Sequence, residues 1–239
     1  MQVSRPWVMR MRWVDLLFAH WPLEPAALRP LIPAGLELET FDGAAWLGVV
    51  PFAMEDVAPR GVPAVPRLSA FPELNVRTYV THQGRPGVWF LSLDTTSRLT
   101  VFGARRFFHL PYVQAKMAAE RDGQAIDYRS QRQDGSAPPA TFEARYSPIG
   151  PVSLADPGSL EAFLTERRRL FAVDARGRIE RTEIRHRPWP LQPASATITR
   201  NELPAAHGLT LPDVAPHLRF SARVDVRAWW PLGSERTSG

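Results

Sequence analysis

Hydrophobic and polar residues alternate with a period of two through much of this chain. Such alternation places neighbouring side chains on opposite faces of a β-strand. Turn residues at Asp42-Gly43, at 83–87 ("QGRPG") and at 121–123 ("RDG") indicate hairpins between strands. The strands predicted in this way are 8–18, 36–41, 44–54, 73–82, 88–95, 113–120, 124–132, 140–148, 176–188, 194–202 and 217–232.

A helical period is confined to short segments. The pattern predicts helices in 23–32, 97–108 and 156–174. Ser97 lies near the start of the second helix, and Asp156 or Ser159 can cap the third. Many strands, three short helices and no βαβ rhythm indicate an α+β, β-rich fold with an antiparallel sheet. The 24 prolines agree with this prediction, since proline limits long helices.

The chain shows no repeat, no low-complexity segment and no clear linker. We therefore expect a single domain over residues 1–232, followed by a disordered tail at 233–239. The proline-rich segment 55–72 is predicted to be a long loop that covers a cavity as a lid.

Composition narrows the class of protein. There is no cysteine, which excludes disulfides and thiolate chemistry. The N-terminus lacks the features of a secretory signal, and no apolar stretch approaches the ~20 residues that span a membrane. We expect a soluble cytoplasmic protein without a membrane partner. The formal charge of +5 arises from 29 basic and 24 acidic residues that are interleaved, so we read the charges as solvated faces and expect no nucleic-acid partner.

Familiar motifs for metals, cofactors and nucleophiles are missing. None of the six histidines has the spacing of a metal-binding pair, so no metal is predicted. The sequence has no glycine-rich phosphate loop, no dinucleotide fingerprint and no Gly-x-Ser-x-Gly elbow, so no cofactor is predicted either. His20 and His186 each precede a Trp-Pro pair and are interpreted as structural.

The segment 71–80 ("FPELNVRTYV") carries candidate chemistry. Glu73, Asn75 and Arg77 share one face of the predicted strand, and apolar residues share the other. One interpretation places the polar face in water, as is common for antiparallel sheets. The other places it inside the sheet against a polar ligand, in which case Arg77 needs a carboxylate to compensate its buried charge.

Lys116 is the single lysine of the chain. It follows the turn "HLPY" at 109–112 in the stretch "ARRFFHLPYVQAKMAAE". Its rarity suggests two interpretations, a nucleophile that forms a Schiff base or an exposed strand residue.

Several of these stretches together resemble a known family. The stretches are "LLFAHWPLEPAALRPLIPAGLELETFDGAAWLGVVPF", "FPELNVRTYV", "GVWFLSLD", "ARRFFHLPYVQAKM", "SLEAFLTERRRLF" and "HRPWPLQ", and they occur in order between about Trp7 and Gln192. They resemble the YqjF-like family of uncharacterised bacterial proteins, which is grouped with the acetoacetate decarboxylase-like superfamily. The resemblance implies a cone-shaped, largely antiparallel β-barrel with a few flanking helices and an internal cavity.

The resemblance also bears on activity. Acetoacetate decarboxylase uses a lysine of lowered pKa whose free amine attacks a ketone. That lysine lies in a Tyr-Pro-Lys-Lys turn, and the matching positions here hold Tyr112 and Val113, neither of which can form a Schiff base. If Tyr112 points inward, Lys116 could do so two steps further along the strand, with Arg77, Arg105 or Arg106 as the neighbouring cation. Glu73 falls where relatives carry a carboxylate that helps to bind substrate.

Three hypotheses follow. The first is a cavity that binds a small organic acid or carbonyl compound without Schiff-base chemistry, lined by Glu73, Asn75, Arg77, Tyr112 and His109, with Arg77 holding the anion. The second is a decarboxylase- or aldolase-type lyase that uses Lys116. The third is a structural or interaction module with no ligand, which predicts Glu73 and Arg77 on the outside. Self-association into a homo-oligomer stays open.

Overall fold

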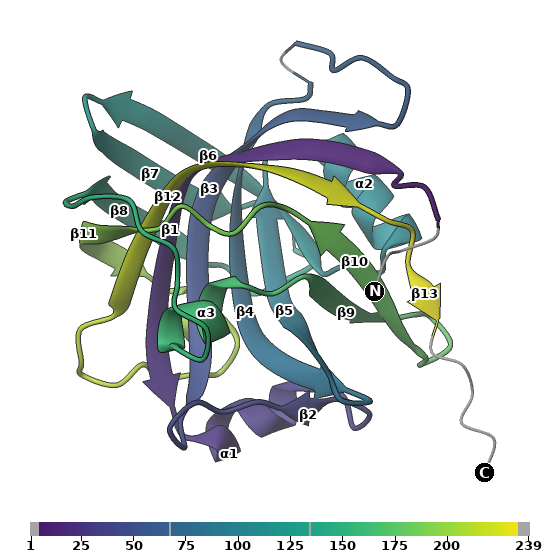
Figure 1. Cartoon of the computed structure of the whole chain (residues 1–239), viewed down its shortest axis with the longest axis horizontal. Coiled ribbons are helices and arrows are strands. Elements are labelled where there is room, and N and C mark those ends of the chain that lie inside the picture. Colours follow the sequence, from purple (N-terminus) through teal and green to yellow (C-terminus); the bar gives the residue numbers. More distant parts are fainter. Residues whose placement is uncertain (1–4, 67, 134, 234–239) are drawn as a thin grey trace.

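One large curved sheet makes up most of the molecule (Figure 1). The structure, a computed structural model, describes residues 5–66, 68–133 and 135–233. The strands are β1 (Met9–Leu23), β2 (Glu37–Leu38), β3 (Ala45–Pro59), β4 (Phe71–His82), β5 (Arg85–Thr95), β6 (Tyr112–Asp122), β7 (Ala125–Arg132), β8 (Thr141–Pro148), β9 (Arg169–Val173), β10 (Ile179–Arg185), β11 (Gln192–Asn201), β12 (His217–Ala228) and β13 (Leu232–Gly233). The helices are α1 (Pro25–Leu28), a 3-10 turn η1 (Arg29–Leu31), α2 (Arg98–Phe107), α3 (Leu160–Thr165) and α4 (Leu203–Ala206).

The sheet closes on itself twice. Its strand order is β13-β10-β9-β5-β6-β7-β8-β11-β12-β1-β3-β4-β2, with additional pairings between β10 and β12 and between β5 and β4. The strands β5, β4, β3, β1 and β12 therefore belong to two closed circuits. One circuit is completed by β9 and β10, and the other by β6, β7, β8 and β11. Most pairings are antiparallel, and the parallel ones join β5 to β6 and β5 to β9. The predicted β-rich, largely antiparallel fold is confirmed.

Each circuit encloses its own hydrophobic core, because the shared strands bury both faces. The core on the β9–β10 side includes Phe18, Phe52 and Trp189. The core on the β6–β8 side includes Leu17, Tyr128 and Phe142. A strand with both faces buried reads as nearly continuous apolar sequence, which is what β1 shows at "DLLFAHWPL".

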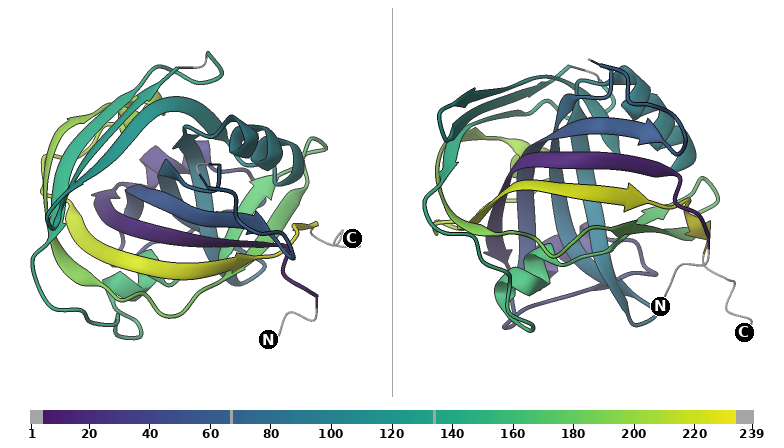
Figure 2. Two further views of the ribbon diagram at one scale, coloured as in Figure 1. Left: turned by 90° about the horizontal axis from the view of Figure 1, so that it is seen from above. Right: turned by 45° about the horizontal axis from the view of Figure 1, so that its top comes forward.

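Helix α2 covers one side of the curved sheet, near β9 (Figure 2). Val101 on the helix packs with Leu110, Tyr112 and Ala172. The predicted helix over 97–108 is confirmed, and its first turn is capped as expected, because the Ser97 Oγ accepts a hydrogen bond from the Thr100 backbone N at 3.2 Å.

The predicted helix over 156–174 is correct only in its first half. Ser159 caps α3 by accepting a hydrogen bond from the Ala162 N, but the helix ends at Thr165. Residues 169–173 form β9 instead, which pairs in parallel with β5. The apolar residues of this stretch satisfy a strand as well as a helix, and the sheet position decides between the two.

Two further predictions need correction. Asp42 and Gly43 do form a turn with positive φ angles, but the preceding segment contributes one isolated bridge, between Phe41 and Ala44. Strand β2 pairs with β4 instead of β3. In the segment 55–72, β3 extends to Pro59 and β4 begins at Phe71, so the connecting loop is shorter than predicted.

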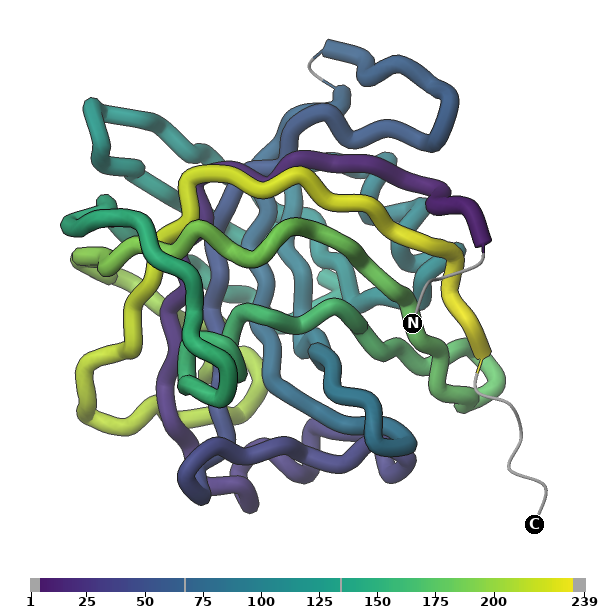
Figure 3. The backbone as a smooth tube through the Cα atoms, viewed as in Figure 1, coloured from purple at the N-terminus to yellow at the C-terminus, as the bar shows by residue number. Residues whose placement is uncertain are grey.

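The described ends of the chain lie on the same side of the molecule (Figure 3). The Trp229 Nε1 donates a hydrogen bond to the Arg5 carbonyl at 2.8 Å. Of the predicted tail at 233–239, Gly233 belongs to β13 and the rest lies outside the described residues. Among the described residues, no helix is long and apolar enough to span a membrane.

Candidate functional site

Strand β4 carries the candidate polar residues, and both of its faces are buried from Glu73 to Val80. Glu73 and Arg77 are 2% and 8% exposed, respectively. Glu73 lies opposite Phe52 of β3, so the polar face of β4 belongs to the core on the β9–β10 side. The interpretation that placed this face in water is wrong, because β5 and β3 flank β4 and the sheet closes over it.

Glu73 and Tyr112 form a buried hydrogen-bonded pair. The Tyr112 hydroxyl donates to the Glu73 Oε2 at 2.8 Å. Burial raises the pKa of Glu73 to about 8; the Tyr112 hydrogen bond opposes this shift, and the negative charge of Asp94 adds to it. Burial also raises the pKa of Tyr112 well above its usual value. At neutral pH both side chains are therefore uncharged and can serve as hydrogen-bonding groups toward a carbonyl.

Arg77 brings a positive charge into the same core. Its Nη2 donates to the Leu164 carbonyl at 2.9 Å, and its guanidinium lies over the rings of Phe18 and Tyr79, 5.4 and 5.7 Å from their centroids. No carboxylate of the described residues lies within 4.0 Å of this guanidinium, and the buried Nε has no hydrogen-bond partner among them. A buried cation of this kind is costly without a counter-ion.

His20 and Tyr79 are buried beside Arg77 and add further polar groups to this core. The sequence alone favours a structural role for His20. The His20 Nε2 lies 2.6 Å from the Tyr79 hydroxyl, which itself donates to the Leu164 carbonyl at 2.6 Å. Since that bond uses the hydroxyl proton, His20 donates through Nε2 and leaves Nδ1 as a buried acceptor without a partner among the described residues. Burial first, and the charge of Arg77 second, lower the pKa of His20 well below its usual value.

Gly48 on β3 leaves space for the side chains of His20 and Arg77. A Cβ atom at position 48 would lie 2.8 Å from the His20 Nε2 and 3.2 Å from the Arg77 Cγ. Gly48 is the register partner of both residues, so the two side chains approach the backbone of β3 at this point. A glycine inside a strand often marks such a close approach, and this signal was available in "AWLGVVPF".

Asn75 lies between Glu73 and Arg77 on the same face. It is 5% exposed, and its Oδ1 has no hydrogen-bond partner among the described residues. We call Glu73, Asn75, Arg77 and Tyr112 the inner cluster. It combines a neutral acid, an amide, a phenol and one uncompensated cation, which is a set of groups suited to a small anion with a further polar atom.

A second buried polar group lies on the opposite face of β5. The Arg132 guanidinium contacts both carboxylate oxygens of Asp94, at 2.9 and 3.0 Å, and each of the two side chains is 1% exposed. It also donates to the Ser92 Oγ at 2.7 Å, and that oxygen lies 3.1 Å from the His207 Nε2. Burial and the Arg132 charge lower the pKa of His207 to about 4. The charges of this group are compensated within the chain.

The two remaining candidates from the sequence lie elsewhere. His109 has a positive φ angle in the turn before β6, and its Nδ1 lies 2.8 Å from the Glu180 Oε2, so it joins this turn to β10. Lys116 is exposed, in the part of β6 that pairs with β7. Arg105, considered as a partner for Lys116, donates instead to the Tyr112 carbonyl at 2.6 Å and thereby holds the strand that carries the phenol.

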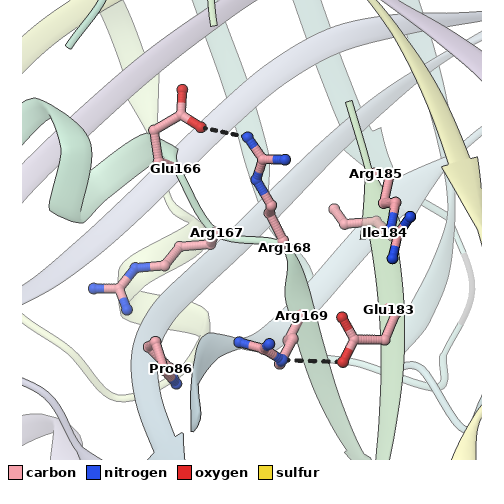
Figure 4. A pocket seen from close by; sticks show the side chains of 8 residues that line it. All are labelled: Pro86, Glu166, Arg167, Arg168, Arg169, Glu183, Ile184 and Arg185. Carbon is pink, nitrogen blue, oxygen red and sulfur yellow. Dashed lines mark hydrogen bonds and ion pairs between the residues drawn. The ribbon is translucent and has the colours of Figure 1, made fainter. Parts of the chain in front are cut away.

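Neither of two pockets on the described surface includes the inner cluster. One, of about 530 Å³, lies between α2 and β6 beside Phe102 and Gln114. The other, of about 570 Å³, lies beside β9 and β10 and is rich in arginine (Figure 4). Among the described residues, no group of three or more His, Cys, Asp or Glu side chains could hold a metal ion.

The sequence matches a family of known proteins over most of its length. The family DUF2071, described as an uncharacterised conserved protein, matches residues 10–225. The uncharacterised protein YqjF of Bacillus subtilis (strain 168) is 47% identical over 226 residues, a match that covers 95% of this chain and 92% of that protein.

Solved structures with the same architecture are more distant in sequence. The enduracididine biosynthesis enzyme MppR, complexed with the condensation product of pyruvate and imidazole 4-carboxaldehyde, has a TM-score of 0.70 at 13% identity, over 96% of this chain and 90% of that one. Acetoacetate decarboxylase of Legionella pneumophila has a TM-score of 0.65 at 13% identity, over 98% and 90%. At such identities the likeness shows the fold alone, and it confirms the acetoacetate decarboxylase-like architecture expected from the resemblance.

Proposed function

Because the chain belongs to the DUF2071 family, the YqjF-like group of uncharacterised proteins, we propose its function from the inner cluster itself. The cluster binds a small organic acid that also carries a carbonyl or hydroxyl group, and it does so without forming a Schiff base. Arg77 holds the carboxylate, and Asn75 with the neutral Glu73–Tyr112 pair holds the second polar group.

The observation that carries this proposal is the charge of Arg77. A buried guanidinium without a carboxylate among the described residues is expected to recruit an anion. With Glu73 protonated at neutral pH, the inner cluster has a net charge of about +1, which a monocarboxylate would neutralise. In the structure the Leu164 carbonyl accepts hydrogen bonds from both Arg77 and Tyr79. An entering carboxylate would compete with this carbonyl for the two donors.

The fold relatives support the same class of ligand by analogy. MppR has been solved in complex with pyruvate, which is a monocarboxylate with a neighbouring ketone. Shared architecture alone does not transfer activity. It supports the proposal only together with the buried cation and the polar groups around it.

A Schiff-base reaction has less support in this chain. The positions that correspond to the lysines of the decarboxylase motif hold Tyr112 and Val113, and Tyr112 is engaged with Glu73. Lys116 is exposed, whereas lysines that form Schiff bases are activated by desolvation or by a neighbouring cation. Borohydride treatment in the presence of pyruvate or acetoacetate, followed by intact-mass measurement, should give no adduct on Lys116. An adduct there would favour the lyase hypothesis.

The hypothesis of a structural module without a ligand predicts Glu73 and Arg77 on the outside. Both are buried, which counts against that hypothesis.

A thermal-shift and calorimetric screen tests the binding proposal. Wild-type protein is titrated with pyruvate, acetoacetate and their neutral methyl esters near neutral pH. We expect saturable binding of at least one acid, weaker binding of its ester, and a loss of about tenfold to a hundredfold in Arg77→Met. Arg129→Met is the matched control, because Arg129 is exposed on β7. Equal affinity for acid and ester, or an unchanged affinity in Arg77→Met, would overturn the assignment.

A further inference from the structure

The arginine-rich pocket beside β9 and β10 is separate from the inner cluster. It has a volume of about 570 Å³, within the range of small-molecule sites. Figure 4 shows Arg168 and Arg169 on the strand β9 side, Glu183, Ile184 and Arg185 on β10, and Pro86 below Arg167 at the lower left. Figure 4 also shows the Arg167 side chain directed to the side opposite Arg185.

Positive charge exceeds negative charge around this pocket. The charge of Arg167 is compensated by Glu39, which lies outside the pocket lining, because the Arg167 Nη1 is 2.5 Å from the Glu39 Oε2. Four further guanidiniums then surround two carboxylates, which leaves a formal excess of two positive charges. The guanidiniums belong to Arg168, Arg169 and Arg185, which line the pocket, and to Arg181, which lies outside the lining and contacts Glu183. The carboxylates belong to Glu166 and Glu183.

The two carboxylates are themselves shared. The Glu183 Oε1 contacts the Arg169 Nε at 3.0 Å and the Arg181 Nε at 3.2 Å. The Glu166 Oε1 accepts a hydrogen bond from the Trp189 backbone N at 2.8 Å, and its Oε2 lies at the long distance of 3.5 Å from the Arg168 Nη2. One glutamate therefore serves two arginines, and the other is partly engaged by the backbone.

Donors toward the pocket remain available. Arg169 donates to Glu183 through its Nε, and no hydrogen bond joins its two Nη groups to a carboxylate of the described residues. Arg168 has one weak contact and a half-exposed side chain. Paired Nη groups of this kind match the geometry of phosphate and carboxylate oxygens.

The crowding of charge is also visible at Arg181. Burial lowers the pKa of its guanidinium, and the neighbouring charges of Arg85, Arg169 and Arg5 lower it further, despite the contact with Glu183. An anion in the pocket would relieve this repulsion.

We propose that this pocket is a second binding site, for a small dianion such as a phosphate monoester or a dicarboxylate. Arg168 and Arg169 bind the oxyanion groups from the β9 side, with Arg185 facing them from β10. Pro86 and Ile184 supply the apolar contacts that an organic ligand would make. The proposal does not depend on the function of the inner cluster.

The test uses the whole protein and probes of defined charge. Inorganic phosphate and succinate are titrated by calorimetry at low and moderate salt, with acetate as the monoanion. We expect saturable binding of at least one dianion, weaker binding of acetate, and weakening by salt. The stronger of the two dianions identifies the oxyanion chemistry.

Four variants separate a site from general surface charge. Arg168→Gln and Arg169→Gln should each weaken dianion binding by about tenfold or more. Arg200→Gln, at an exposed arginine of β11 paired with Glu202, should leave it unchanged. Glu183→Gln removes the competing carboxylate and should tighten binding severalfold, an outcome that misfolding cannot imitate.

Several results would overturn the proposal. They are a wild-type protein without saturable binding of either dianion, an equal loss in Arg200→Gln, or a loss in Glu183→Gln. Arg77→Met should bind the dianion like the wild type, so failure of this site and failure of the inner cluster are distinguishable.

Discussion

Two arginines are buried to nearly the same extent in this protein, and their surroundings differ. Counted over the whole residue, backbone included, Arg77 is 8% exposed and Arg132 is 7% exposed. Arg132 makes a two-point contact with the carboxylate of Asp94. Arg77 contacts the carbonyl of Leu164 and two aromatic rings, with no carboxylate of the described residues at ion-pair distance.

The comparison separates a structural ion pair from a binding group. Asp94 supplies the compensating charge for Arg132 within the chain, so that region is complete without a ligand. The region around Arg77 keeps an uncompensated cation and unsatisfied polar atoms on Asn75 and His20. Polar groups left unsatisfied in a buried site are a common mark of function, because stability alone would select against them.

The two regions also respond to pH in opposite directions. In the inner cluster, burial raises the pKa of Glu73 from 4.5 to about 8. Near Arg132, the pKa of His207 is lowered from 6.5 to about 4. The raised pKa of Glu73 makes the folded state less stable as pH rises, whereas the lowered pKa of His207 makes it less stable as pH falls.

Breaking the Asp94–Arg132 pair should have the largest effect. Asp94→Ala or Arg132→Ala leaves a single buried charge, so we expect the free energy of unfolding to fall by about 3–5 kcal/mol. Replacing both residues, as Asp94→Leu with Arg132→Met, should restore most of that loss. Urea denaturation measures all three. If the single variants lost no more than surface variants do, the pair would not be the structural contact described here.

The sequence identified much of this arrangement through local pattern. Alternation in "FPELNVRTYV" placed Glu73, Asn75 and Arg77 on one face, and the structure keeps them there. Alternation cannot say which face meets water, because that depends on whether distant strands close over it. The structure contradicts the interpretation that placed the polar side in water and agrees with the one that placed it inside the sheet.

Contacts between distant segments were the part that could not be predicted. Arg132 on β7 meets Asp94 on β5, and neither residue has a local signal for the other. Similarly, the apolar stretch near Leu170 fits a helix in isolation and becomes a strand because β5 offers it a partner. The resemblance supplied the architecture and pointed to Glu73 and Tyr112. A glycine inside the predicted strand 44–54 was a signal for Gly48, whereas the contacts of His20 and Gly48 with Arg77 became visible only in the packing.

The second-largest effect is expected in the pH dependence of the free energy of unfolding, through Glu73 of the inner cluster. Between pH 4.5 and about 8 the folded protein keeps a proton on Glu73 that the unfolded chain has lost, so this contribution to stability declines as pH rises through that window. Glu73→Gln keeps an acceptor for Tyr112 but cannot ionise, and should remove a decline on the order of a few kcal/mol. Urea denaturation across the window measures it, with exposed Glu37→Gln as control. A decline of the same size in Glu73→Gln would assign it to another group.

The loss of stability at acidic pH tests the region around Arg132 and His207, and its expected size is smaller. Between pH 6.5 and about 4 the unfolded chain binds a proton at His207 that the folded protein does not, so stability is lost as pH falls. Since His207 is only partly buried, we expect His207→Gln to remove roughly 1–2 kcal/mol of that loss. In the Asp94→Leu, Arg132→Met background the loss should also shrink, because the neighbouring positive charge is gone. An unchanged acid response in both would contradict the role of Arg132.

The smallest effect on stability, and the sharpest contrast with Arg132, is expected at Arg77. Arg77→Met removes one hydrogen bond to Leu164 and two ring contacts, but it also removes a buried charge that no carboxylate of the described residues balances. A methionine occupies similar space, so these terms should nearly cancel and the ligand-free protein should change by no more than about 1 kcal/mol. Urea denaturation without ligand measures this. A loss as large as that of Arg132→Ala would mean that Arg77 is structural, whereas near-neutral stability combined with lost acid binding would identify a cation kept for a ligand.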